Sequence, residues 1–158
     1  MNLDDFTNGV SLTHKDRSVL NTAWIFGIVY FVFGFVETIA DIYQFTGDTS
    51  FFTTISYTIV KIISSVAFVL FFMGFLKMAE LYSSQLLKTI VYIFMITYVL
   101  SSAMDIYAIH LTNESVLIST VVELIVFGAI QIVFGLSLLQ LKDALGTLIQ
   151  VNGILEII

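Results

Sequence analysis

Five ionisable side chains interrupt stretches of sequence that otherwise have the composition of membrane-spanning helices: Glu37, Asp41, Lys61, Asp105 and Glu123. A charged side chain at the centre of a bilayer costs about 2.5 to 3.5 kcal/mol on insertion scales, so we expect none of the five to face lipid unpaired. Four carboxylates accompany a single lysine, which neutralises at most one or two of them. The others must protonate, bind a cation or reach water, and this is the chemistry of a proton or monovalent-cation site.

A structural role for the same residues is the alternative. Lys61 paired with Glu37 or Glu123 would form a buried salt-bridge network that fixes the register of the helices and transports nothing. In either case we predict that Glu37, Lys61 and Glu123 meet inside the protein. The two hypotheses differ in whether the surplus carboxylates bind a proton or a cation.

The composition predicts the elements that position these charges. Of the 158 residues, 58% are hydrophobic and 11% are charged, unlike an ordinary soluble domain. The apolar residues form blocks long enough to cross a hydrocarbon core of about 30 Å as helices, and they lack the alternation of β-barrel strands. We predict an all-α, polytopic integral membrane four-helix bundle. Its spans run over about 20–44, 51–76, 87–110 and 116–141.

Each predicted span carries one polar stripe at helical spacing. Steps of three and four residues place the charged side chains on the same helix faces as other polar or aromatic residues. We expect these stripes to face the bundle interior, because hydrogen-bonding groups find no partners in lipid. The supporting residues of the stripes are Tyr30, Tyr57, Ser64, Tyr98, Ser101, Thr120 and Gln131.

Two glycine pairs at heptad spacing suit close helix packing: Gly27 with Gly34, and Gly128 with Gly135. The aromatic residues, fifteen Phe and seven Tyr, are expected to serve as lipid-facing packing and interfacial anchors rather than as a cofactor box.

The basic residues predict the orientation. Lys15 and Arg17 precede the first span, Lys77 and Lys88 flank the second loop, and Lys142 follows the last span. The other two loops contain no Lys or Arg. The positive-inside rule therefore predicts cytoplasmic N- and C-termini in a cytoplasmic-type membrane. Counting the helix rise of 1.5 Å per residue from the loops, all five charges then lie in the outer half of the bilayer.

Both ends of the chain and one internal similarity leave alternatives open. Residues 1–19 are expected to form a cytoplasmic tail, and 142–158 either a short amphipathic interfacial helix, the start of a fifth span, or a helix that docks on a partner subunit. The tripeptide 41–43, Asp-Ile-Tyr, recurs at 105–107. Two tandem helical hairpins related by an axis along the membrane normal would explain this recurrence.

The sequence also excludes several classes of function. Without cysteine the chain forms no disulfide, thiolate nucleophile or cysteine-ligated metal site, and six Lys and Arg residues make no basic patch for nucleic acid. No set of nucleophile, base and orienting residue stands out, and no glycine-rich phosphate loop occurs. Short loops such as 45–50 leave no room for a soluble catalytic domain. We expect no enzyme, no cofactor and no metal site.

Three functional hypotheses remain. The first is a non-catalytic subunit of a larger membrane assembly, in contact with the lipid bilayer and with other membrane subunits or further copies of itself. The second is a homo-oligomeric cation or proton pathway that uses Glu37, Asp41, Asp105 and Glu123 and is modulated by Lys61. The third is a pore-forming or membrane-perturbing effector.

Overall fold

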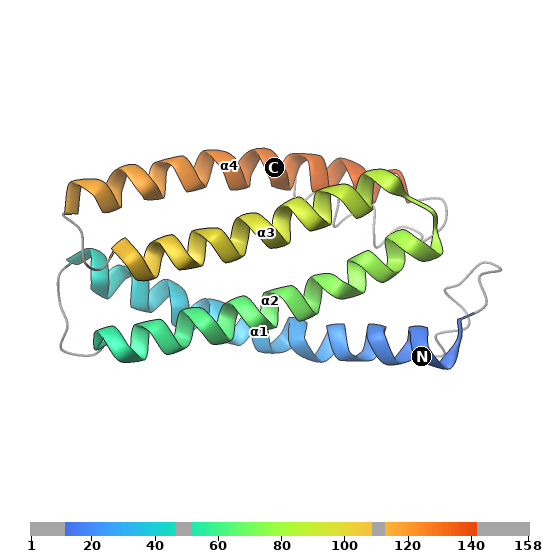
Figure 1. Ribbon diagram of the computed structural model, residues 1–158, viewed down its shortest axis with the longest axis horizontal. Helices are drawn as coiled ribbons and strands as arrows, with labels where there is room; N and C mark the ends of the chain where they lie inside the picture. The colour runs from blue at the N-terminus through green and yellow to red at the C-terminus, as the bar shows by residue number, and fades with distance from the viewer. Residues whose placement is uncertain (1–11, 47–51, 109–112, 142–158) are drawn as a thin grey trace.

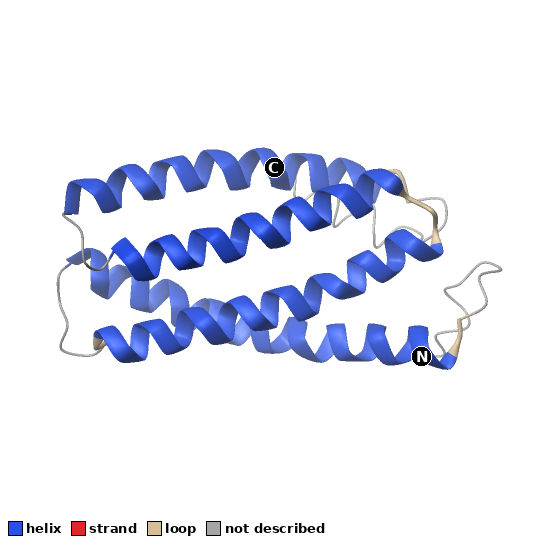
Figure 2. Ribbon diagram, viewed as in Figure 1, coloured by secondary structure: helices blue, strands red, loops and turns tan. Residues whose placement is uncertain are grey.

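Four long helices make up the computed structural model, which describes residues 12–46, 52–108 and 113–141. The side chains of 44–46 and 113–120 are outside this description. The helices are α1 (His14–Thr46), α2 (Thr54–Leu81), α3 (Gln85–Ala108) and α4 (Asn113–Leu139). All four are long and apolar enough to cross a membrane, and the described residues contain no strand (Figure 2). The predicted all-α, four-helix membrane bundle is confirmed.

Successive helices run antiparallel along the long axis of the bundle (Figure 1). The end of α1, the start of α2, the end of α3 and the start of α4 therefore lie at one end of the molecule, and the α2–α3 turn lies at the other. The five predicted charges all lie in the halves of their helices nearest this first end. The antiparallel chain path therefore brings them into the same half of the bundle.

The first helix begins six residues earlier than the predicted span, at His14 instead of residue 20. Thr13 caps it: its hydroxyl accepts a hydrogen bond from the Asp16 backbone N–H at 3.3 Å. In return, Asp16 Oδ2 accepts from the Thr13 backbone N–H at 2.9 Å and from the Thr13 hydroxyl at 2.7 Å. This reciprocal capping box satisfies donors that a helix start otherwise leaves free, so the helix extends into the predicted tail.

The second helix also differs from the predicted span 51–76 at both ends. It begins after Thr53, whose side chain accepts a hydrogen bond from the Ser56 backbone N–H, and it continues to Leu81. Ser83 ends it with a left-handed φ of 52°. The Ser84 N–H donates to the Ala79 carbonyl at 2.9 Å and the Ser83 N–H to the Glu80 carbonyl at 3.2 Å, the pattern of a Schellman cap. The predicted segment 142–158 lies outside the described residues.

Phenylalanine rings fill the interior where α2, α3 and α4 meet. The ring centroid of Phe72 lies 5.0 Å from that of Phe94 and 5.6 Å from that of Phe134. Phe68 stacks on Tyr98 at 4.0 Å. These aromatic contacts connect the last helix to the bundle, so part of the aromatic content that we expected to face lipid forms the core instead. Other aromatics do face outward, such as Phe35.

The contact between α1 and α2 depends on small residues. A Cβ placed on Gly74 would lie 2.6 Å from the Cβ of Ala23, which is closer than side-chain atoms approach one another. A Cβ on Gly27 would lie 2.8 Å from the ring of Phe71. Gly74 therefore lets the two helices approach closely at Ala23, and Gly27 leaves room for the ring of Phe71 between them.

Candidate functional site: an intramembrane charge cluster

Lys61 lies at the centre of a buried ionic cluster. Its side chain is 3% exposed, and its Nζ lies 2.7 Å from Asp105 Oδ2, 2.9 Å from Glu37 Oε1 and 3.1 Å from Asp41 Oδ1. Glu37 and Asp41 belong to α1, Lys61 to α2 and Asp105 to α3. One ammonium group thus joins three helices. We call Glu37, Asp41, Lys61 and Asp105 the Lys61 cluster.

Helix geometry explains how each helix presents its members of the cluster. Glu37 and Asp41 are four residues apart on α1, so both carboxylates project from the same face. The antiparallel return of the chain then brings Lys61, seven residues into α2, to the same depth. Asp105 reaches this depth because it lies three residues before the end of α3.

Hydroxyl groups surround the carboxylates. Ser64 donates a hydrogen bond to Glu37 Oε2, and the Tyr98 hydroxyl donates to the same oxygen at 3.0 Å. The Tyr57 hydroxyl donates to Asp41 Oδ1 at 2.8 Å. Both oxygens of Glu37 therefore have partners: Lys61 holds one, and the two hydroxyls hold the other. Such a satisfied polar network is rigid, because each group would lose its partner if it moved.

The cluster carries more negative charge than Lys61 can neutralise. Three carboxylates and one ammonium amount to a formal charge of −2. An ammonium group has three N–H donors, and each has a separate carboxylate here, so Lys61 has no donor left for a further ligand. The side chains of the three acids are not equally enclosed: Glu37 is 12% exposed, Asp105 24% and Asp41 45%. Among the three acids of the cluster, Asp41 is therefore the most exposed.

Glu123 is the exception among the five predicted charges. It makes no ion pair with Lys61 among the described residues, and its Oε1 atom is buried without a hydrogen-bond partner. We predicted that Glu37, Lys61 and Glu123 meet. In the structure the positions next to the ammonium belong to Asp41 and Asp105, which leave no donor of Lys61 for the carboxylate of α4.

Some supporting residues of the predicted stripes contact the Lys61 cluster, and others do not. Tyr57, Ser64 and Tyr98 hydrogen-bond to the carboxylates of the cluster. Tyr30 packs its ring against Tyr98, with centroids 5.9 Å apart.

Of the other three supporting residues, Ser101 and Gln131 make no hydrogen bond to the Lys61 cluster among the described residues. Ser101 is half-buried on α3. Gln131 is exposed on α4 and does not reach the cluster. The side chain of Thr120 lies outside the description.

In each predicted glycine pair, one glycine is closely packed and the other is not. Gly27 lies against Phe71, and Gly135 is buried. A Cβ added to Gly34 or Gly128 would have no described atom within 4 Å, so neither residue is needed for close helix packing within the part of the chain that the structure describes. Gly74, which no heptad pair includes, makes a tighter approach than Gly27: a Cβ there would lie 2.6 Å from the Cβ of Ala23.

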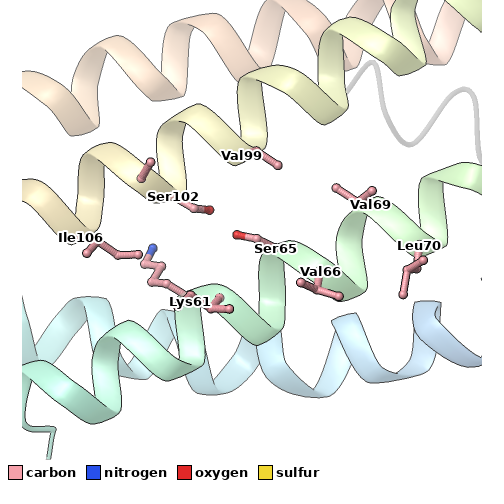
Figure 3. A pocket seen from close by; sticks show the side chains of 10 residues that line it. Lys61, Ser65, Val66, Val69, Leu70, Val99, Ser102 and Ile106 are labelled. Atoms are coloured by element: carbon pink, nitrogen blue, oxygen red, sulfur yellow. The ribbon is translucent and has the colours of Figure 1, made fainter.

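An apolar cavity of about 380 Å³ lies beside the cluster between α2 and α3 (Figure 3). Lys61 and Ile106 border one end of it, and Val69 and Leu70 border the other. Its polar edge includes Ser65, whose hydroxyl oxygen is buried without a hydrogen-bond partner. The described residues contain no group of three His, Cys, Asp or Glu side chains arranged to hold a metal ion.

A second ionic contact, which we did not predict, lies at the opposite end of the bundle. Lys77 Nζ of α2 lies 2.8 Å from Asp16 Oδ1 of α1 and 3.2 Å from Glu80 Oε2. The sequence does contain a signal for it, because Thr13-His14-Lys15-Asp16 is a capping-box pattern that places a carboxylate at the start of the helix. The Lys61 cluster near one end and the contact between Lys77 and Asp16 near the other hold α1 against α2.

Comparisons of this chain with protein-family models, with curated proteins and with solved structures found no match. Function is therefore inferred from the geometry of the cluster and from the surfaces of the four helices.

Proposed function

We propose that this integral membrane protein is a non-catalytic subunit of a larger membrane assembly. The observation that carries the proposal is the saturation of Lys61, whose three N–H donors each have a carboxylate partner from α1 or α3. A cation held in this way joins α1, α2 and α3 to one another. It has no donor left with which to bind a substrate or to stabilise a reaction intermediate.

The distribution of polar groups supports the same proposal. Glu37, the most enclosed acid of the cluster, has partners at both of its oxygens. Such a network fixes helix register in a bilayer, where apolar contacts alone do not distinguish protein from lipid. A small bundle with a fixed internal register and broad apolar outer faces is suited to packing against other membrane chains.

The experiment is affinity purification of the full chain from its native membrane in a mild detergent. We expect other membrane chains, or further copies of this one, to elute with it at a fixed molar ratio. As a matched test of specificity, Lys61→Met should reduce the recovery of the complex, whereas Lys88→Met should not. If the wild-type chain elutes alone in detergents of several kinds, the proposal is contradicted.

A second candidate function is a proton pathway, favoured by Glu123. Its buried Oε1 has no hydrogen-bond partner, and a negative charge in that position is unfavourable, so the carboxyl is expected to carry a proton. A proton-carrying carboxyl inside the membrane is a feature of proton relays. The formal charge of −2 on the neighbouring cluster would attract the proton or another cation.

This candidate is tested with a membrane-permeant carbodiimide, a reagent that modifies protonated carboxyl groups. We expect mass mapping to find the adduct on Glu123, and Glu123→Gln to abolish it. An unmodified Glu123 under conditions that label a carboxyl in a control membrane protein would contradict its role as a proton carrier.

A further inference from the structure

The side chain of Gln131 is exposed on α4, a helix long and apolar enough to cross a membrane. Gln131 is five residues beyond Val126, the middle residue of α4, and this corresponds to about 7.5 Å along the helix axis. Half of the hydrocarbon core measures about 15 Å. Gln131 is exposed, and its side chain makes no hydrogen bond among the described residues. A primary amide in this position has donors and an acceptor without partners.

The surface around Gln131 has room for another helix. Leu124, Gly128 and Gln131 follow one another at steps of four and three residues, so they share one face of α4. Leu124 is 70% exposed, and no atom of the described residues lies within 4 Å of a Cβ position on Gly128. With Ile132 beside them, these residues form what we call the Gln131 face: an apolar strip with a glycine that permits close approach and one amide.

The chemistry of the amide favours a particular partner. A glutamine side chain offers an acceptor oxygen and two N–H donors, so two glutamines satisfy each other by reciprocal hydrogen bonds. A carboxylate or an ammonium group does not pair with itself in this way. Copies of one chain insert into a membrane with the same orientation, and residue 131 therefore lies at the same depth in each. A two-fold axis along the membrane normal would bring the two amides together.

We propose that two copies of this protein associate in the membrane through their Gln131 faces, with the two Gln131 amides hydrogen-bonded across the two-fold axis. This inference rests on the proposed function and deepens it, because it identifies one partner in the assembly as a second copy of the chain. Gly128 allows the two α4 helices to approach closely enough for the amides to meet, and Leu124 and Ile132 pack at the edge of the contact.

The chain contains no cysteine, so single substitutions report on this contact by oxidative cross-linking in the membrane. Leu124→Cys places a thiol on the Gln131 face. Val122→Cys is the matched control, since it is two residues away on the same helix, is also exposed, at 54%, and projects from the opposite side. We expect at least tenfold more disulfide-linked dimer from Leu124→Cys than from Val122→Cys at low protein-to-lipid ratio.

Adding Gln131→Leu to Leu124→Cys should reduce the cross-linked fraction at least threefold without changing the helical circular dichroism signal. Single-molecule photobleaching of labelled protein in liposomes provides a second measurement, in which the same substitution should shift two-step traces to one-step traces. Equal cross-linking at residues 122 and 124, or no effect of Gln131→Leu, overturns the inference.

Two further outcomes separate the inference from the proposed function. If Leu124→Cys cross-links to a different membrane protein in the native membrane, the second copy is the wrong partner although the subunit function stands. If the protein is monomeric by photobleaching and also elutes alone from its native membrane, both proposals fail.

Discussion

Lys61 Nζ lies 2.7 Å from Asp105 Oδ2, and this contact joins two helices through residues 44 positions apart in the sequence. It is the shortest of the three ionic contacts of Lys61. Because the other two partners, Glu37 and Asp41, come from α1, the same ammonium holds α1 and α3 on either side of α2. The consequences for stability differ for each member of the cluster.

Lys61→Met should strongly destabilise the protein. The substitution removes the cation and leaves three carboxylates close together, so their charges are no longer compensated. Breaking a buried ion pair by removing one partner typically costs about 3 to 5 kcal/mol, and the partial exposure of Asp41 places the expected loss near the lower value. The measurement is the free energy of unfolding in mixed detergent micelles.

A compensating substitution distinguishes repulsion between the carboxylates from a general loss of packing. Asp105→Asn combined with Lys61→Met should recover part of the lost free energy of unfolding, because it removes one of the uncompensated charges. Lys88 makes no ion pair among the described residues, so Lys88→Met serves as the control and should change stability little. Equal losses in the free energy of unfolding for Lys61→Met and Lys88→Met would contradict the proposal that Lys61 joins the three helices.

Tyr98→Phe should destabilise the protein by about 2 kcal/mol, the usual range for a lost hydrogen bond to a charged group. The Tyr98 hydroxyl donates to Glu37 Oε2 at 3.0 Å. Tyr92→Phe is the matched control on the same helix, since Tyr92 is 47% exposed, and it should change stability by less than about 0.5 kcal/mol. Thermal unfolding of both variants in one detergent checks the difference, and similar shifts in Tm would count against the hydrogen bond.

Gly74→Ala and Gly34→Ala should have opposite effects on stability. A Cβ at residue 74 would overlap that of Ala23, and relieving such overpacking costs about 1 to 3 kcal/mol. At residue 34 the space is open, and alanine in a helix interior is favoured over glycine by about 0.5 to 1 kcal/mol. Unfolding of the two variants under one condition gives the comparison. A Gly74→Ala protein at least as stable as Gly34→Ala would show that α1 and α2 are not in close contact.

Thr13→Ala should weaken the start of α1 by about 1 kcal/mol, because the Thr13 hydroxyl caps the helix. Amide hydrogen exchange of residues 14–17 should become faster. Thr38→Ala is a suitable control, since the hydroxyl of Thr38 donates to the Gly34 carbonyl inside the helix and caps nothing. Unchanged exchange in Thr13→Ala would mean that α1 begins independently of this cap.

Much of the fold and part of the cluster could be predicted from the sequence, because the length of an apolar block and the helix rise determine depth. Depth alone places Glu37, Asp41, Lys61, Asp105 and Glu123 in one half of the bundle. It does not determine which carboxylates contact the lysine, since that depends on the rotation of each helix about its axis. Lys61 therefore contacts Asp41 and Asp105 beside Glu37, whereas the helix spacing predicts Glu123 as its second partner.

The inward aromatics were not predictable for a related reason. In a soluble helix the apolar face marks the core, but both the core and the lipid-facing surface of a membrane helix are apolar. Nothing in the local sequence around Phe72, which is buried, distinguishes it from Phe35, which is exposed. Gly34 and Gly128 also match a packing pattern, but no atom of the described residues lies close to a Cβ position on either, because the spacing does not specify which helix face has a neighbour.

We propose that the Lys61 cluster fixes the helices of a non-catalytic subunit and conducts no ions. The decisive measurement is proton and monovalent-cation flux through liposomes that contain the purified full-length protein. We expect flux no greater than through empty liposomes, for the wild type and for Glu37→Gln alike. A flux that appears with the wild type and is abolished by Glu37→Gln in a protein that remains folded would contradict the claim.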